Sequence, residues 1–287
     1  MALKTILVAA SGGTASDGAV EIACRLARRL GSQLEGFHVR ADPVELLSMM
    51  GGGDAFGMPV SGDWIDRFVA DAAQLAAKTK PAFMAAAARH GLATTTATSK
   101  TASATWREET GYAPVLVARR ARFFDLAVLG RSDRVVERPH TDTIEETLIH
   151  SGRPVLLAPA KPPTEIGETI AVGWNGTAES VHVIAASLPI LAAARSVSII
   201  TVGKEPTDSP LALLDYLAWH DIHAKHRQVQ PVSGVGSGEQ LLAEARDEGA
   251  DLLVMGGYGH RPWRELLFGG ATRHVIGTSL LPVLLAH

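Results

Sequence analysis

The chain alternates short runs of apolar residues with longer segments in which apolar residues recur every three or four positions. Unbroken apolar runs are typical of the buried strands of a parallel sheet, and the three-to-four-residue period is typical of helices. In the first half the pattern predicts strands over residues 5–10, 33–39, 93–98 and 126–129. Helices are predicted between these strands, from Ser16, over 64–90 and over 114–120.

The second half shows the same alternation in a more compact form. Its strands are predicted over residues 169–173, 196–202, near Val229 and over 252–255. Its helices are predicted to begin at Thr177 and to cover 211–224 and 239–248. Strands that alternate with helices form a parallel sheet with helices on both faces, because the crossovers are right-handed. The pattern therefore predicts an open α/β fold.

Three segments of the first half recur in the second half in the same order. The pairs are 5–12 (TILVAASG) with 169–176 (TIAVGWNG), 125–130 (DLAVLG) with 251–256 (DLLVMG), and 153–158 (RPVLLA) with 281–286 (LPVLLA). Three shared anchors in one order indicate the duplication of a whole domain, since a solenoid would show several short units. The proline-rich segment 159–163 stiffens the chain between the copies. We therefore predict two tandem domains, 1–160 and 166–287.

Glycines cluster after the predicted strand 252–255 of the second half. Gly256 and Gly259 follow the apolar run 252–255, and Gly269 and Gly270 come just before a segment with helical periodicity. Glycine lets backbone N–H groups approach a ligand, and the N-terminus of a helix favours an anion such as phosphate. This end of the chain is interpreted as strand, nucleotide loop, helix and strand. The alternative is that the glycines only form tight turns.

The repeat and these glycines together resemble the universal stress protein family in its tandem form. The resemblance implies two Rossmann-like domains of the adenine nucleotide alpha hydrolase type. The nucleotide-binding subgroup carries glycine, two residues, glycine, nine residues, glycine and then serine or threonine. Gly256, Gly259 and Gly269 match the three glycines; Gly270 stands at the hydroxyl position, and Thr272 keeps a hydroxyl on the same turn.

The resemblance also implies a nucleotide site in the second domain. In this family the first strand ends in an Asp-Gly-Ser-like turn that faces the nucleoside, and here the turn is Asn175-Gly176-Thr177. The implied ligand is ATP or another adenine nucleotide, with or without Mg²⁺. The implied contacts are Gly173, Trp174, Asn175, Val202, Gly256, Gly259, Gly269, Gly270, Ala271 and Thr272.

Several of these residues also have purely structural interpretations. Asn175 precedes a helix, where an Asn side chain can cap an orphan N–H group. Trp174 either packs in the core or stacks on adenine, and Val202 on sequence alone belongs to the core. His220, His223 and His226 fall near the end of one predicted helix without a carboxylate or cysteine that would complete a metal site, so we interpret them as solvated.

In the first half the glycine signature is broken. Gly130 remains, but Asp133 stands where the second glycine should be, and further acids follow at Glu137, Asp142, Glu145 and Glu146. Carboxylates repel a phosphate, and without glycines the backbone cannot approach it closely. We therefore predict that the first half binds no nucleotide.

No arrangement of a nucleophile and a base emerges, and no hydrolase elbow, zinc-protease helix or Walker loop is found. We expect no dedicated catalytic residue and at most slow hydrolysis of bound ATP. The predicted function is a sensor or regulator in stress adaptation. One alternative is a nucleotide-free interaction scaffold. Another alternative is an enzyme similar to N-type ATP pyrophosphatases. Residues 11–16 of this chain resemble the loop of those enzymes, although Ala15 stands where they have Asp.

Composition and charge argue against further classes of protein. The net charge of -3, with both signs mixed along the chain, argues against nucleic-acid binding. No apolar run approaches the roughly 20 residues of a membrane span. Cys24 is the single cysteine and falls on an apolar helix face, so we interpret it as packing and expect a cytoplasmic protein.

The resemblance also implies how the two copies associate, because in this family the last strands pair across a dimer interface. In a tandem chain the last strands, 154–158 and 282–286, are therefore expected to pair with each other and form an intramolecular pseudo-dimer. A homodimer of the whole chain is a further expectation, and a protein partner is left open. The Met- and Gly-rich insertion 43–62 is interpreted as a surface loop, with a position over a dimer surface as the alternative.

Overall fold

The computed structural model describes residues 3–43, 45, 62–94, 101–131, 138–203, 208–257 and 270–287. The elements of the first half are β1 (Thr5–Ala9), α1 (Gly13–Leu30), β2 (Gln33–Ala41), α3 (Gly62–Arg89), β3 (Ala93–Thr94), β4 (Ser103–Gly111), α4 (Ala113–Ala121), β5 (Leu126–Gly130), α5 (Arg138–His150) and β6 (Val155–Ala158). Those of the second half are β7 (Thr169–Gly173), α6 (Ala178–Ala192), β8 (Ser196–Val202), α7 (Pro210–Ala218), β9 (Ala224–Val229), α8 (Ser237–Asp247), β10 (Leu252–Gly256), α9 (Gly270–Thr278) and β11 (Val283–Ala286).

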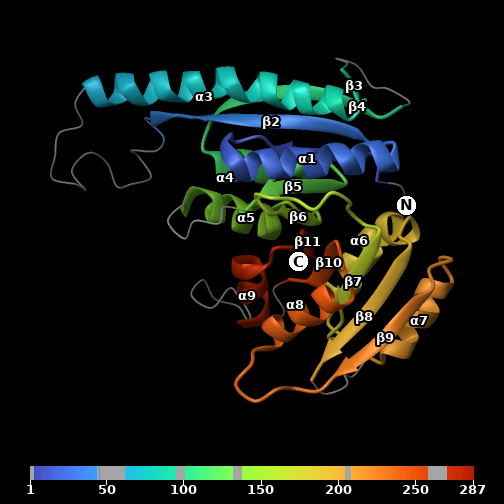
Figure 1. Cartoon of the computed structure of the whole chain (residues 1–287). Coiled ribbons are helices and arrows are strands. Elements are labelled where there is room, and N and C mark those ends of the chain that lie inside the picture. The colour runs from blue at the N-terminus through green and yellow to red at the C-terminus, as the bar shows by residue number, and fades with distance from the viewer. Residues whose placement is uncertain are drawn as a thin grey trace.

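Within this part of the chain, one sheet of 11 strands runs through both halves in the order β3-β4-β2-β1-β5-β6-β11-β10-β7-β8-β9. Neighbouring strands are parallel within each half, whereas β6 and β11 pair antiparallel, with Leu284 opposite Leu156. Figure 1 shows this junction near the middle of the molecule, where the C-terminus lies. The predicted pairing of the two last strands is confirmed, and it leaves neither strand as a free edge.

Helices cover both faces of the sheet, as predicted. Successive strand residues point to opposite faces, so Ile6 and Leu7 belong to two different core clusters. One cluster packs under α1, α3, α6 and α7, and the other under α4, α5, α8 and α9. Both clusters contain residues from the two halves, so the hydrophobic core is continuous along the sheet.

The repeated aspartates explain why the segments starting at 125 and 251 match. The carboxylate of Asp251 accepts hydrogen bonds from the N–H groups of Gly167 (2.7 Å), Glu168 (3.0 Å) and Thr169 (3.2 Å). Asp125 accepts from the N–H of Lys4 at 2.8 Å and from the N–H and hydroxyl of Thr5 at 3.0 and 3.1 Å. Each aspartate thus fixes the start of the first strand of its own half.

Arginines of the first half reach across to the second. Arg29 of α1 forms an ion pair with Glu168 at 2.6 Å and donates to the carbonyl oxygen of Ile166 at 2.9 Å. Arg131, buried directly after β5, donates to the carbonyl oxygen of Ile276 near the end of α9 at 2.7 Å. Such bonds satisfy carbonyls that a helix C-terminus leaves unpaired.

Three sequence expectations were wrong in detail. Strand β4 (Ser103–Gly111), which carries several charged residues, was missed; of the strand expected over 93–98, the structure shows Ala93–Thr94 as β3, and 95–98 lie outside the described residues. Helix α7 ends at Ala218, so His220 lies beyond it and His226 is on β9, where it contacts the Thr201 hydroxyl at 3.2 Å. Helix α1 begins at Gly13. The insertion 43–62 lies almost wholly outside the described residues.

Cys24 packs in the core with no exposed surface, in agreement with its interpretation as a packing residue. Burial, followed by the nearby Glu21 carboxylate, raises the pKa of its thiol to about 12. At pH 8 only about 1 in 10⁴ thiols would be ionised, and the thiolate is the reactive form. We expect a disulfide reagent to label the native protein at least about 100-fold more slowly than the guanidinium-denatured chain. Comparable labelling rates in stopped-flow absorbance would contradict this burial.

None of the helices in the described ranges is both long and apolar enough to cross a membrane.

Candidate functional site

The residues predicted to bind nucleotide lie at one edge of the sheet of the second half. Gly173 at the end of β7 pairs with Met255 of β10 and with Ile200 of β8. Val202 and Gly256 therefore lie at the same carboxyl edge. Because β10 and β11 are parallel, the connecting helix α9 runs back against them and begins at this edge. The edge thus brings together the ends of three strands and the first turn of α9.

Gly256 has a role in the fold. A Cβ atom at this position would lie 2.7 Å from the backbone nitrogen of Ser180 and 2.9 Å from the carbonyl carbon of Glu179, in the first turn of α6. Gly130 makes the same approach to α1, where a Cβ would be even closer to the carbonyl oxygen of Ala15. This glycine is required in both halves for the close packing of strand and helix. That explains its presence in the half that lacks the rest of the signature.

The turn after β7 is held by its own side chains. Thr177 caps α6 by accepting a hydrogen bond from the N–H of Ser180 at 3.4 Å. The Asn175 side-chain oxygen accepts from the N–H and hydroxyl of Thr177 at 3.3 and 3.0 Å, and from the Ser180 hydroxyl. The interpretation of Asn175 as the helix cap was therefore wrong. Its side chain is exposed and braces the turn that Thr177 caps.

A glycine that the sequence analysis did not single out joins two further helices. A Cβ atom on Gly238, in the first turn of α8, would lie 2.6 Å from the carbonyl oxygen and 2.9 Å from the Cα of Ala271 in α9. The first turns of α8 and α9 therefore touch, while the first turn of α6 touches Gly256. The spacing Gly234-Val235-Gly236-Ser237-Gly238 before a helical segment was the available sequence signal. Helix N-termini carry partial positive charge, so this edge favours an anion.

The residues at the start of α9 differ in their surroundings. Gly270 is exposed, and a Cβ there would meet nothing within 4 Å. Ala271 is half-buried, and the Thr272 side chain is buried at 7% exposure. Gly259 and Gly269 lie outside the described residues.

Trp174 packs on the opposite face of the sheet from Leu241, which is the neighbour of Gly173. The indole is 5% exposed, and its N–H donates to the carbonyl oxygen of Asp208 at 3.1 Å. Stacking on adenine would require this side chain to leave the core, so packing is the role that its position supports. Val202 lies half-buried against the other core cluster.

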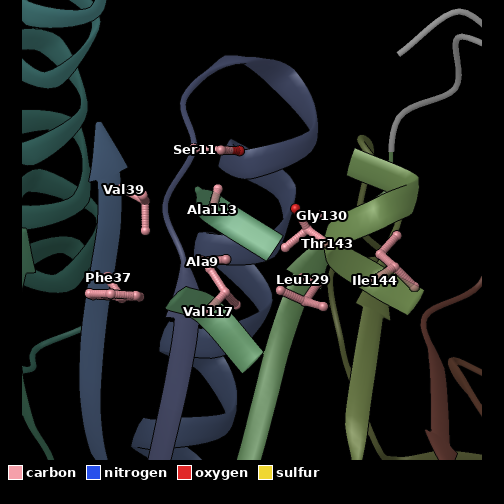
Figure 2. Close-up of a pocket in the computed structure, with 10 residues that line it drawn as sticks. All are labelled: Ala9, Ser11, Phe37, Val39, Ala113, Val117, Leu129, Gly130, Thr143 and Ile144. Atoms are coloured by element: carbon pink, nitrogen blue, oxygen red, sulfur yellow. The ribbon is translucent and has the colours of Figure 1, made fainter. Parts of the chain in front are cut away.

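The first half contains a cavity at the corresponding place, shown in Figure 2. Ala9, Val39 and Gly130 line it, and through the repeat they correspond to Gly173, Val202 and Gly256. Ile144 of α5 closes it where the second half has Thr272. The cavity measures about 50 Å³. Small-molecule pockets usually measure roughly 300–1,000 Å³, so this one is small for a nucleotide.

Acidic residues also lie along α5, beyond its first turn. Burial, and next the Asp142 carboxylate, raise the pKa of Glu145, while Arg273 of α9 partly offsets this. Burial, and then Asp142 and Glu146, likewise raise the pKa of Tyr112. Asp142 occupies the position that Gly270 has in the second half. The carboxylates of α5 and the small cavity both support the prediction that the first half binds no nucleotide.

In the described part of the chain, no group of three or more His, Cys, Asp or Glu residues is arranged to hold a metal ion.

Comparison with known proteins identifies the family from the second half. Residues 175–287 match the model of the Universal stress protein family. The match places residues 175–287, the second half, in the universal stress protein family.

Individual universal stress proteins agree with this assignment. One from Synechocystis is 26% identical over 166 residues, which cover 56% of this chain and 57% of that protein. One from Methanocaldococcus jannaschii is 41% identical over 46 residues, which cover 16% of this chain and 28% of that protein. The matches therefore span about half, or less, of the length of these relatives.

The fold extends the likeness to the whole chain. The crystal structure of a universal stress protein from Archaeoglobus fulgidus matches with a TM-score of 0.74 at 13% identity, over 100% of this chain and 99% of that one. At this identity the match shows the fold alone. The expected architecture, an α/β fold with parallel sheets in two tandem copies, is therefore confirmed.

Proposed function

We propose that the second half binds ATP or another adenine nucleotide, and that the protein acts as a sensor or regulator in stress adaptation. The observation that carries this proposal is that the first turns of α8 and α9 touch at the carboxyl edge of β7, β8 and β10, where the first turn of α6 packs against Gly256. Such an edge is where open α/β sheets bind ligands. The family of residues 175–287 supports the same site.

The phosphates are placed at the start of α9 and the base near Val202. Exposed N–H groups of the first turn would bind the phosphates, and the open Gly270 leaves room beside them. Gly173 and Val202 border the half-buried part of the edge, where an apolar base surface is favoured. Mg²⁺, when bound with the nucleotide, would neutralise phosphate charge, and we propose at most slow hydrolysis.

The proposal also covers the domain boundaries, the cellular location and the association of chains. We place the domain boundaries at 1–160 and 166–287, on either side of the segment that the α1 arginines hold. We also propose a cytoplasmic location, based on the single cysteine, and further association of two chains into a homodimer.

The test uses the full-length protein, because separating the halves would expose the β6 and β11 edges. Calorimetric titration with ATP should show one site per chain. Gly270→Asp, which copies Asp142 of the first half, should weaken ATP binding about tenfold by placing a carboxylate at the start of α9. Gly270→Ser, which restores the hydroxyl of the family signature, should bind ATP at least as tightly as the original. Both fit an open position, so unchanged melting is the folding control.

Two outcomes would contradict the proposal. If no nucleotide binds, and none is released when the purified protein is denatured and chromatographed, a nucleotide-free scaffold becomes the better description. If ATP binds equally well to Gly270→Asp, the phosphates lie elsewhere.

A further inference from the structure

A second hollow lies on the face of the sheet that carries Trp174, between α6 and α7. This groove measures about 380 Å³. Most of its lining is apolar: Trp174, Val181, Ile184, Ala212, Leu213 and Tyr216. Val181 is 51% exposed despite its branched apolar side chain. Small-molecule pockets of roughly 300–1,000 Å³ are typically lined in this way, with a few polar groups that fix orientation.

Among the described residues that line the groove, one is charged. Asp208 is exposed, and its carboxylate makes no ion pair or hydrogen bond within the described residues. The other polar side chain, Ser209, is already engaged, since its hydroxyl accepts from the N–H of Leu211 at 3.2 Å and caps α7. The groove therefore combines an apolar wall with a single negative charge available to a ligand.

The corresponding groove of the first half is different in kind. It lies between α1 and α3, measures about 520 Å³, and its charged lining residues are Asp17, Glu21, Lys78 and Arg89. Two acids and two bases balance there, and Glu21 is paired with Arg89. Among the described residues, the groove of the first half is thus lined by charges of both signs, whereas that of the second half is lined by one carboxylate on an apolar surface.

Trp174 gives this groove a fixed wall. Its indole N–H is bound to the main-chain oxygen of Asp208 at 3.1 Å, so the ring and the acidic residue are held together. Tyr216 adds a second aromatic ring to the lining. Because the Trp174 ring is nearly buried, the partly exposed Tyr216 ring is the one available to a cation, and the carboxylate of Asp208 favours the same charge.

We propose that the groove between α6 and α7 binds a small organic cation, with its aromatic or aliphatic body against the apolar wall and its protonated amine at Asp208. The volume limits the occupant to a small molecule. The nucleotide site proposed above uses the opposite face of the sheet, so a negative result for one proposal does not contradict the other.

The test compares two probes that share one ring and differ in charge. Tryptamine carries an ammonium group, and indole-3-acetate carries a carboxylate. In titrations of the full-length protein followed by NMR, tryptamine should bind at least about fivefold more tightly. Asp208→Asn should weaken tryptamine binding about two- to fivefold, since an exposed ion pair contributes about that much, and should not weaken the binding of indole-3-acetate, which the carboxylate repels.

Two further variants locate the site. Ala212→Trp adds bulk at an exposed position of the groove and should abolish the binding of tryptamine. Asp215→Asn removes an exposed acid of α7 that does not line the groove, and it should change nothing. Melting temperatures serve as the folding control. The proposal is overturned if tryptamine does not bind, if both probes bind equally, or if binding survives Ala212→Trp.

Discussion

Gly256→Ala is expected to lower the free energy of unfolding by about 1–3 kcal/mol, although it adds only one methyl group. The added carbon would lie 2.7 Å from the Ser180 nitrogen and 2.9 Å from the Glu179 carbonyl carbon. Both are backbone atoms of α6, which cannot move aside as a flexible side chain can. To make room, the first turn of α6 would have to shift away from β10.

Gly130→Ala provides the matching measurement in the first half. Its added carbon would come even closer to the carbonyl oxygen of Ala15, so the loss should be at least as large. Gly277→Ala is the control, because a Cβ there meets nothing within 4 Å and the residue is exposed near the end of α9. That change should raise the unfolding free energy by up to about 1 kcal/mol through helix propensity. Urea unfolding midpoints distinguish these results. Unchanged stability of the Gly130 and Gly256 variants would contradict the prediction, because it would mean that α1 and α6 shift away from the added methyl group at little cost.

The fold was largely predictable because its main determinants are periodic. Apolar runs bounded by turns identified β1, β5, β7 and β10, and the family resemblance together with the duplication predicted that β6 and β11 pair. Strand β4 escaped because it carries Arg107, Glu108 and Glu109 and therefore lacks an apolar run. The end of α7 escaped as well, since Asp221 adopts a left-handed conformation (φ 59°) that is rare outside glycine and is not encoded by a recognisable motif.

The candidate site was predictable only in part. Spacing identified Gly256, but its contact with α6 depends on how the helix crosses the strand. The same limitation applies to Gly238, whose partner Ala271 is distant in the sequence. Thr177 rather than Asn175 caps α6, because the direction in which the chain leaves β7 decides which oxygen reaches the first free N–H group. Sequence spacing thus identifies candidates, whereas the angles between elements determine their contacts.

Asp251→Ala is expected to cost about 2–4 kcal/mol of unfolding free energy, the other large effect that the structure implies. Three N–H groups donate to this one carboxylate, and the variant would leave them to water or without partners at a partly buried place. Asp251→Asn keeps one side-chain oxygen as an acceptor and should lose about half as much. Asp215→Ala, at an exposed position of α7, should change stability by less than about 0.5 kcal/mol. Scanning calorimetry and urea unfolding measure all three.

The shape of the unfolding transition adds a second test to the same variant. The sheet is continuous through β6 and β11, and both core clusters contain residues of the two halves. Asp251→Ala should therefore shift one cooperative transition of the whole chain, as should Asp125→Ala in the first half. If each variant shifted only its own half in a two-step melt, the antiparallel junction would be too weak to couple the halves. In that case each copy would unfold as an independent domain.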